Sequence, residues 1–121
     1  MLGMNTWRIE PSLFFQKGMQ ISTKSFNAPA PNKTNIKKFR SHFGVSPGVC
    51  SVVWNMIVNS NSIMSIPNFV FLLWALLFLK TYQTENVLGP MVGADSKTFR
   101  NHVWPMVGLI AGLKPIVVSL L

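Results

Sequence analysis

Apolar residues recur along the chain at the spacing of an α-helix, in stretches separated by glycine, proline and polar clusters. The first clear stretch carries three apolar residues spaced i, i+3 and i+7, which would share one helix face: Ile36, Phe39 and Phe43. A cap at Thr34 or Asn35 would begin this helix, and Gly44 would end it. The pattern therefore predicts a helix between these caps.

A second helix is predicted from Ser46-Pro47, because serine can cap a helix and proline fits its first position. The stretch is strongly apolar as far as Asn59, where a cluster of polar residues predicts a loop. With the preceding helix it forms one candidate helix-turn-helix. Only Ser51 and Asn55 would offer polar contacts on the outer face of its second helix, so we expect this pair to be structural.

The continuous apolar run from Phe69 to Leu79 predicts a buried central helix. The run has eleven residues. Pro67-Asn68 would open the helix, which would extend to Tyr82. Crossing a bilayer takes about 20 apolar residues, so the run is short for a membrane span. We expect this helix to be the pillar on which the flanking helix pairs pack.

A second candidate helix-turn-helix follows the run. Its first helix would begin at Thr84-Glu85 and would be short or kinked, because Gly89-Pro90 interrupts the hydrogen-bond ladder. Gly93 would supply the turn, and Asp95 or Ser96 would cap the second helix. Three apolar residues would share a helix face: Val87, Leu88 and Val92. In such a motif the second helix must be polar on its outer face, which four residues would supply here: Ser96, Lys97, Arg100 and Asn101.

The charge of the chain favours a polyanionic partner. The 121 residues carry a formal net charge of +8, from eleven Lys and Arg against three acids, and seven of the eleven lie at or before Arg40. Such an excess suits nucleic acid or an anionic membrane surface. Residues 1–34 show no sustained periodicity, and Asn27–Asn32 is rich in proline. We expect residues 1–34 to form a basic, largely disordered arm whose aromatic residues dock on the core.

Residue types that carry catalysis or bind metals are few and far apart. The three acids would fall in the arm, at a helix start and at a cap: Glu10, Glu85 and Asp95. His42 and His102 are 60 residues apart, which is not the spacing of metal ligands. Cys50 is the one cysteine, so no internal disulfide can form, and we expect it to be a core residue. We therefore expect no catalytic residue, no metal site and no cofactor.

Three blocks of the sequence together resemble a known family: KKFRSHFGVSP, FLLWALLFLK and TYQTENVLGPMVGADSKTFRNHVW. In their order and spacing they are similar to the helical region that precedes the catalytic domain in Harbinger-type DDE transposases of eukaryotes. The similar region runs roughly from Asn35 to Leu113. Pro90 and Pro105 depart from the family pattern, which usually continues the helix at these positions.

The resemblance and the periodicity lead to one expectation: an all-α bundle with a helix-turn-helix at residues 35–113, between the basic arm at 1–34 and an apolar tail at 114–121. The family carries three catalytic acids on a downstream ribonuclease-H-like sheet, so we expect these 121 residues to bind double-stranded DNA without nuclease activity. The nucleus would be the compartment, with a full-length transposase or a second copy as a further partner.

Eight residues are the predicted DNA contacts: Ser96, Lys97, Thr98, Arg100, Asn101, Lys37, Lys38 and Arg40. Arg100 suits guanine and Asn101 suits adenine at base edges, while Ser96, Lys97 and Thr98 would contact mainly phosphate.

Two other functional classes remain open at this point. A small membrane or membrane-surface protein would use two short hydrophobic segments, Ile63 to Leu79 and Val103 to Leu121, with the basic arm on the cytoplasmic side. A helical interaction module would instead present a large exposed patch, around Trp54, Trp74 and Trp104.

Overall fold

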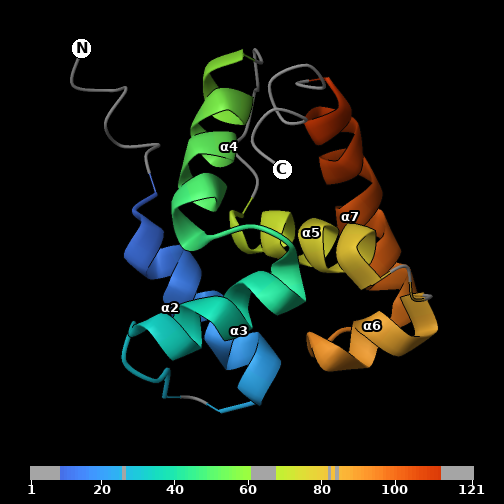
Figure 1. The fold of residues 1–121 in the computed structure, drawn as a ribbon. Helices are drawn as coiled ribbons and strands as arrows, with labels where there is room; N and C mark the ends of the chain where they lie inside the picture. Colours follow the sequence, from blue (N-terminus) through green and yellow to red (C-terminus); the bar gives the residue numbers. More distant parts are fainter. Residues whose placement is uncertain (1–8, 26, 61–67, 82, 84, 113–121) are drawn as a thin grey trace.

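A computed structural model of the chain describes residues 9–25, 27–60, 68–81, 83 and 85–112. All regular structure in this part of the chain is helical, as the sequence predicts (Figure 1). The helices are α2 (Pro11–Thr23), α3 (Lys33–Phe43), α4 (Pro47–Ser60), α5 (Val70–Thr81), α6 (Glu85–Met91) and α7 (Ser96–Ala111).

The apolar run forms α5, which lies at the centre of the bundle. Six consecutive residues, Leu72 to Leu77, are buried, and α5 packs against all five of the other described helices. Figure 1 shows α4 and α7 on one side of α5, with α2, α3 and α6 on the other. The expected pillar is therefore confirmed. It begins one residue later and ends one residue earlier than predicted, and Asn68 Oδ1 accepts a hydrogen bond from the Val70 N–H at 3.0 Å.

The α3–α4 connection follows the predicted local signals closely. Gly44 ends α3 with a φ of 82°, and Ser46 Oγ accepts a hydrogen bond from the Val49 N–H at 3.2 Å. The start of α3 differs from the prediction, because Asn32 is the cap and its Oδ1 accepts from the Asn35 N–H at 2.9 Å. The helix therefore includes Lys33 in its first turn.

The largely disordered arm expected for residues 1–34 is wrong for residues 11–23, which form α2. Phe14 and Met19 are completely buried, and the Phe14 ring lies edge-on to Phe69 with centroids 5.1 Å apart. A Cβ at Gly18 would overlap the Phe39 ring, so α2 approaches α3 closely. The apolar face of α2 buries enough surface to order the segment, despite its basic charge. Docking of the arm aromatics is thus confirmed for Phe14 and Phe15, whereas Trp7 and Phe26 lie outside the described residues.

The α6–α7 pair is a short helix, a tight turn and a long helix. α6 has seven residues and ends just after Pro90, as predicted for a helix interrupted by proline. Gly93 in the turn has a φ of 80°. A Cβ at Gly89 would lie 2.7 Å from the Ala94 carbonyl oxygen, so only glycine allows the turn to fold back so closely on α6.

The apolar face predicted for α6 is only partly correct. Leu88 is fully buried, Val92 is half-buried, and Val87 is 48% exposed. Adjacent helical residues point about 100° apart, because an α-helix has 3.6 residues per turn. A helix this short presents only one narrow stripe to the core, and Val87 falls outside it.

Candidate nucleic-acid interface

The predicted reading helix, α7, is held by a regular apolar stripe. Its buried residues are spaced i, i+4, i+7 and i+11: Phe99, Val103, Met106 and Ile110. α7 packs chiefly against α5 and α6. Because this stripe points inward, the polar residues of the first two turns of α7 point outward.

The structure brings the five predicted α7 contacts together at the start of that helix. Lys97, Thr98, Arg100 and Asn101 are exposed, and Ser96 is half-buried beside the turn. In a DNA-bound helix-turn-helix the N-terminal residues of the second helix are those that contact base edges. The exposed polar residues of α7 therefore lie in its first two turns.

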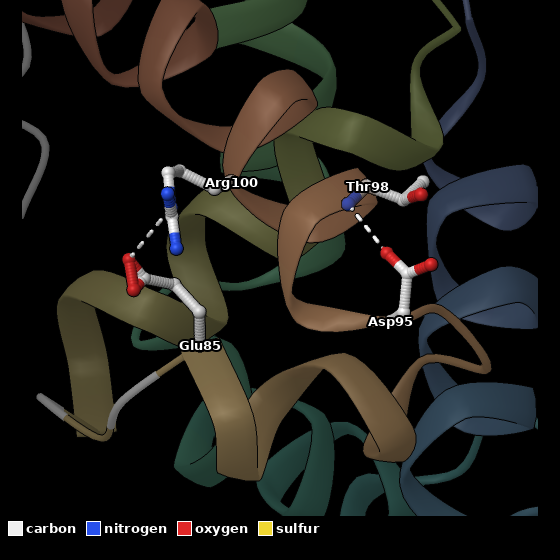
Figure 2. A network of polar contacts seen from close by, with 4 residues as sticks. All are labelled: Glu85, Asp95, Thr98 and Arg100. Atoms are coloured by element: carbon white, nitrogen blue, oxygen red, sulfur yellow. Dashed lines mark hydrogen bonds and ion pairs between the residues drawn. The ribbon is translucent and has the colours of Figure 1, made fainter.

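Arg100 is not free on this surface. Its Nε lies 3.5 Å from Glu85 Oε1 at the start of α6, with the Arg100 side chain 56% and the Glu85 side chain 26% exposed (Figure 2). An exposed ion pair of this kind contributes about 0–1 kcal/mol. It nevertheless directs the guanidinium toward α6 and offsets its charge. No local sequence signal predicts this pairing, because the two residues belong to different helices.

Asp95 caps α7 as predicted. Its Oδ1 accepts a hydrogen bond from the Thr98 N–H at 2.7 Å (Figure 2), and this bond lowers the pKa of Asp95 below its ordinary value of 3.8. A carboxylate therefore already occupies the N-terminus of α7. The Thr98 backbone donor is unavailable to a phosphate unless the cap is displaced.

The charges of the α6–α7 pair cancel, whereas those of α3 do not. Glu85 and Asp95 balance Lys97 and Arg100 within residues 85–111. α3 instead carries four exposed cations and no acid: Lys33, Lys37, Lys38 and Arg40. Phe39 and Phe43 bury the opposite face of α3 and so fix which side these cations occupy. The strongest positive surface on the described helices is therefore α3.

On α4, the second helix of the other candidate helix-turn-helix, neither of the two polar residues predicted for the outer face is exposed. Ser51 is buried, and its hydroxyl donates to the Ile9 carbonyl oxygen at 2.6 Å, which anchors the segment before α2. Asn55 is half-buried. α4 is therefore a core helix.

Burial also makes the Cys50 thiol on α4 unreactive. Its side chain has no exposed surface, and burial raises the pKa of the thiol to about 12. The thiol is therefore protonated at neutral pH and is a poor nucleophile. Among the described residues, no group of three or more His, Cys, Asp or Glu could hold a metal ion.

The exposed tryptophan patch expected for an interaction module is not present. Trp54 and Trp74 are only 1% and 9% exposed, because α4 and α5 bury them in the core, whereas Trp104 on α7 is 49% exposed. Its indole packs edge-on against Phe78 with centroids 5.2 Å apart. Nearby, the exposed His102 ring stacks on Phe71 at 4.0 Å, a contact between helices that periodicity alone does not reveal.

None of the helices within the described ranges has the length and apolar character needed to cross a bilayer. The two segments of the membrane interpretation, Ile63 to Leu79 and Val103 to Leu121, lie partly outside the described residues.

No protein-family model, curated protein or solved structure matches the chain.

Proposed function

We propose that this protein binds double-stranded DNA, with α3 contacting the phosphate backbone and the start of α7 contacting base edges. The observation that carries the proposal is the row of four exposed cations on α3, which has no acid on the same helix. Sequence-independent binding to duplex DNA comes chiefly from phosphate neutralisation by such cations. A helix rigidly backed by Phe39 and Phe43 is a suitable support for them.

Sequence preference would come from α7. Asn101 is exposed and suits the paired donor and acceptor of adenine, while the Arg100 guanidinium suits guanine. Arg100 would first have to exchange the Glu85 carboxylate for a base edge. Lys97, Ser96 and Thr98 would then contact the sugar-phosphate backbone of the DNA. Lys97 is the one cation among these three residues.

The resemblance to Harbinger-type transposases supports a role at mobile-element ends. We propose DNA binding, and not cutting, as the role of these 121 residues, because in the resembled family the catalytic acids belong to a separate domain. The protein would act in the nucleus, with a full-length transposase or a second copy as its protein partner.

Fluorescence anisotropy with a random-sequence duplex, measured over a range of salt concentrations, tests the α3 assignment. Lys37→Gln/Lys38→Gln removes two exposed charges from α3. Each phosphate contact contributes about 0.9 to the slope of log Kd against log salt, so the slope should fall by up to about 1.8. The matched control, Lys17→Gln/Lys24→Gln, removes the same charge from α2 and should change the slope much less.

Three results would contradict the proposal. The first is no measurable binding to duplex at low salt. The second is an equal effect of the α2 and α3 variants, which would mean that net charge alone drives association. The third is retention of the wild-type slope when both α3 lysines are neutral.

A further inference from the structure

A groove lies between α2 and the turn that joins α6 to α7, which Figure 2 shows side by side. Its volume is about 570 Å³, within the range of roughly 300–1,000 Å³ that is usual for small-molecule sites. One wall is formed by Lys17 and Ile21 of α2 and by Lys24, the residue that caps the C-terminal end of this helix. Residues 90–93 form the opposite wall. Val70 and Trp74 of α5 line the groove between the two walls.

The groove has a mostly apolar interior, and both of the charged residues that line it are lysines. Lys17 is half-buried and Lys24 is exposed, and both stand on the α2 wall. No Asp or Glu lines the groove. Glu85 is paired with Arg100, and one carboxylate oxygen of Asp95 caps α7.

The opposite wall and the interior are mostly apolar. Met91 and Val92 are half-buried at the end of α6, and Pro90 beside them is exposed. Val70 is half-buried at the start of α5, and Trp74 retains 9% of its surface. Apolar surface of this kind, next to two ammonium groups, complements a molecule that is apolar over most of its length and anionic at one end.

We propose that this groove binds a small anionic amphiphile, with its apolar chain against Val70, Trp74 and Met91 and its carboxylate at Lys17 or Lys24. Duplex DNA does not fit this description, because its phosphates carry no apolar chain. A helical peptide is 10–12 Å across and fills roughly 400–600 Å³ per turn, so the groove holds little more than one turn. The site is distinct from the α3 cations and does not depend on the DNA-binding proposal.

Dodecanoate, below its micelle-forming concentration, is the probe for the test with the full chain. We expect saturable binding of one equivalent in isothermal titration calorimetry. Amide NMR shifts should concentrate at residues 20–24 and 91–93. Dodecanol and dodecyltrimethylammonium, which match the chain but lack the negative charge, should bind at least tenfold more weakly.

The variants used for DNA binding separate the two proposals when both are measured with both ligands. Lys17→Gln/Lys24→Gln should weaken dodecanoate binding at least tenfold. Lys37→Gln/Lys38→Gln should leave it within twofold of wild type. Dodecanoate binding can therefore fail while DNA binding succeeds, or the reverse.

Absence of dodecanoate binding would overturn the inference. Equal affinity for dodecanol and dodecanoate would also overturn it, as would a dodecanoate affinity that Lys17→Gln/Lys24→Gln leaves unchanged. Either result would mean that the apolar chain binds without help from the lysines. Saturable binding of an acidic amphipathic peptide in this groove, without binding of dodecanoate, would overturn it in favour of a protein partner.

Discussion

At the scale of single residues, close backbone approaches and caps decide the shape of the candidate interface. Gly89 lets the turn fold back on α6, Gly93 supplies the positive φ of that turn, and Asp95 starts α7. Each of these features follows from the chemistry of one residue. They fix the direction in which α7 leaves the turn and hence the side on which Asn101 is displayed.

Replacing Gly89 by alanine should destabilise the fold. The new Cβ would lie 2.7 Å from the Ala94 carbonyl oxygen, a backbone atom that cannot move without shifting the turn. We expect a loss of about 1–3 kcal/mol in the free energy of unfolding, measured by urea denaturation with circular dichroism. Gly108→Ala is the control, because outside its own stretch of helix no atom of the described residues lies within 4 Å of the added Cβ. That control should stabilise α7 by about 0.5–1 kcal/mol, and equal effects of the two variants would contradict the packing described for Gly89.

Removing the carboxylate of Glu85 should strengthen DNA binding. Glu85→Gln frees the Arg100 guanidinium and removes a negative charge beside the proposed base contacts. Exposed ion pairs are worth about 0.2–1 kcal/mol, so we expect a gain of up to about fivefold in affinity, with a stability loss of the same size or less.

Glu10→Gln is the matched control for Glu85→Gln in anisotropy titrations, because it removes the same charge at the start of α2. It should change affinity much less. Weaker binding by Glu85→Gln would mean that the pair positions Arg100 for DNA. Arg100→Ala should itself cost about 1–3 kcal/mol of specific binding.

At the scale of elements, local sequence signals predicted helix ends better than they predicted which segments fold. Gly44, Ser46 and Asp95 act within one helical turn of their own positions, so the sequence nearby is sufficient to place them. The sequence pattern does not predict α2, because prolines and basic residues surround it, although it has Pro11 at its start and an apolar face. Its order comes from contacts with α3, α4 and α5, which no local pattern reports.

Truncating Phe14 should therefore behave as a core substitution and not as a change in a dispensable arm. The ring has no exposed surface and contacts Phe69. Phe14→Ala should lower the free energy of unfolding by about 3–5 kcal/mol, measured by urea denaturation. Leu13→Ala, at a neighbouring residue that is 38% exposed, is the control and should cost a fraction of that. A loss below about 1 kcal/mol for Phe14→Ala would show that α2 does not contribute to the core.

At the scale of the whole molecule, the predicted DNA contacts lie on two surfaces that differ in charge, α3 and the start of α7. The sequence correctly predicted a polar start for α7. It did not predict that Glu85 would pair with Arg100, because that contact exists only after α6 and α7 fold together. The positive surface consequently lies on α3, and the α6–α7 pair as a whole is electrically balanced. The all-α class and the central position of α5 were predictable, because an eleven-residue apolar run demands cover on every side.

The buried thiol reports on opening of the core around α4. Cys50 has no exposed surface, so its reaction with a disulfide reagent should be slow in native conditions and complete within seconds in denaturant. Rapid stoichiometric labelling of the native protein would contradict the packing of α4. The reaction rate at several urea concentrations measures how often the core around α4 opens.

Stability should also fall in alkaline solution because of this thiol. Its folded pKa is about 12, above the ordinary value of 9.0, so the unfolded chain loses its proton first as pH rises. The contribution is fully present below pH 9 and is lost progressively as pH rises toward 12. In Cys50→Ala this part of the pH dependence should disappear, and identical alkaline profiles for the two proteins would contradict the assignment.

The contacts of α5 with every other described helix have a consequence for how the molecule comes apart. If any of these helices detached, part of the apolar surface of α5 would be exposed to water. We therefore expect that no smaller group of the described helices is stable alone. Limited proteolysis should therefore give intact chain and short peptides, with few fragments of intermediate size. A force applied at α3 or α7 would be shared by all the described helices.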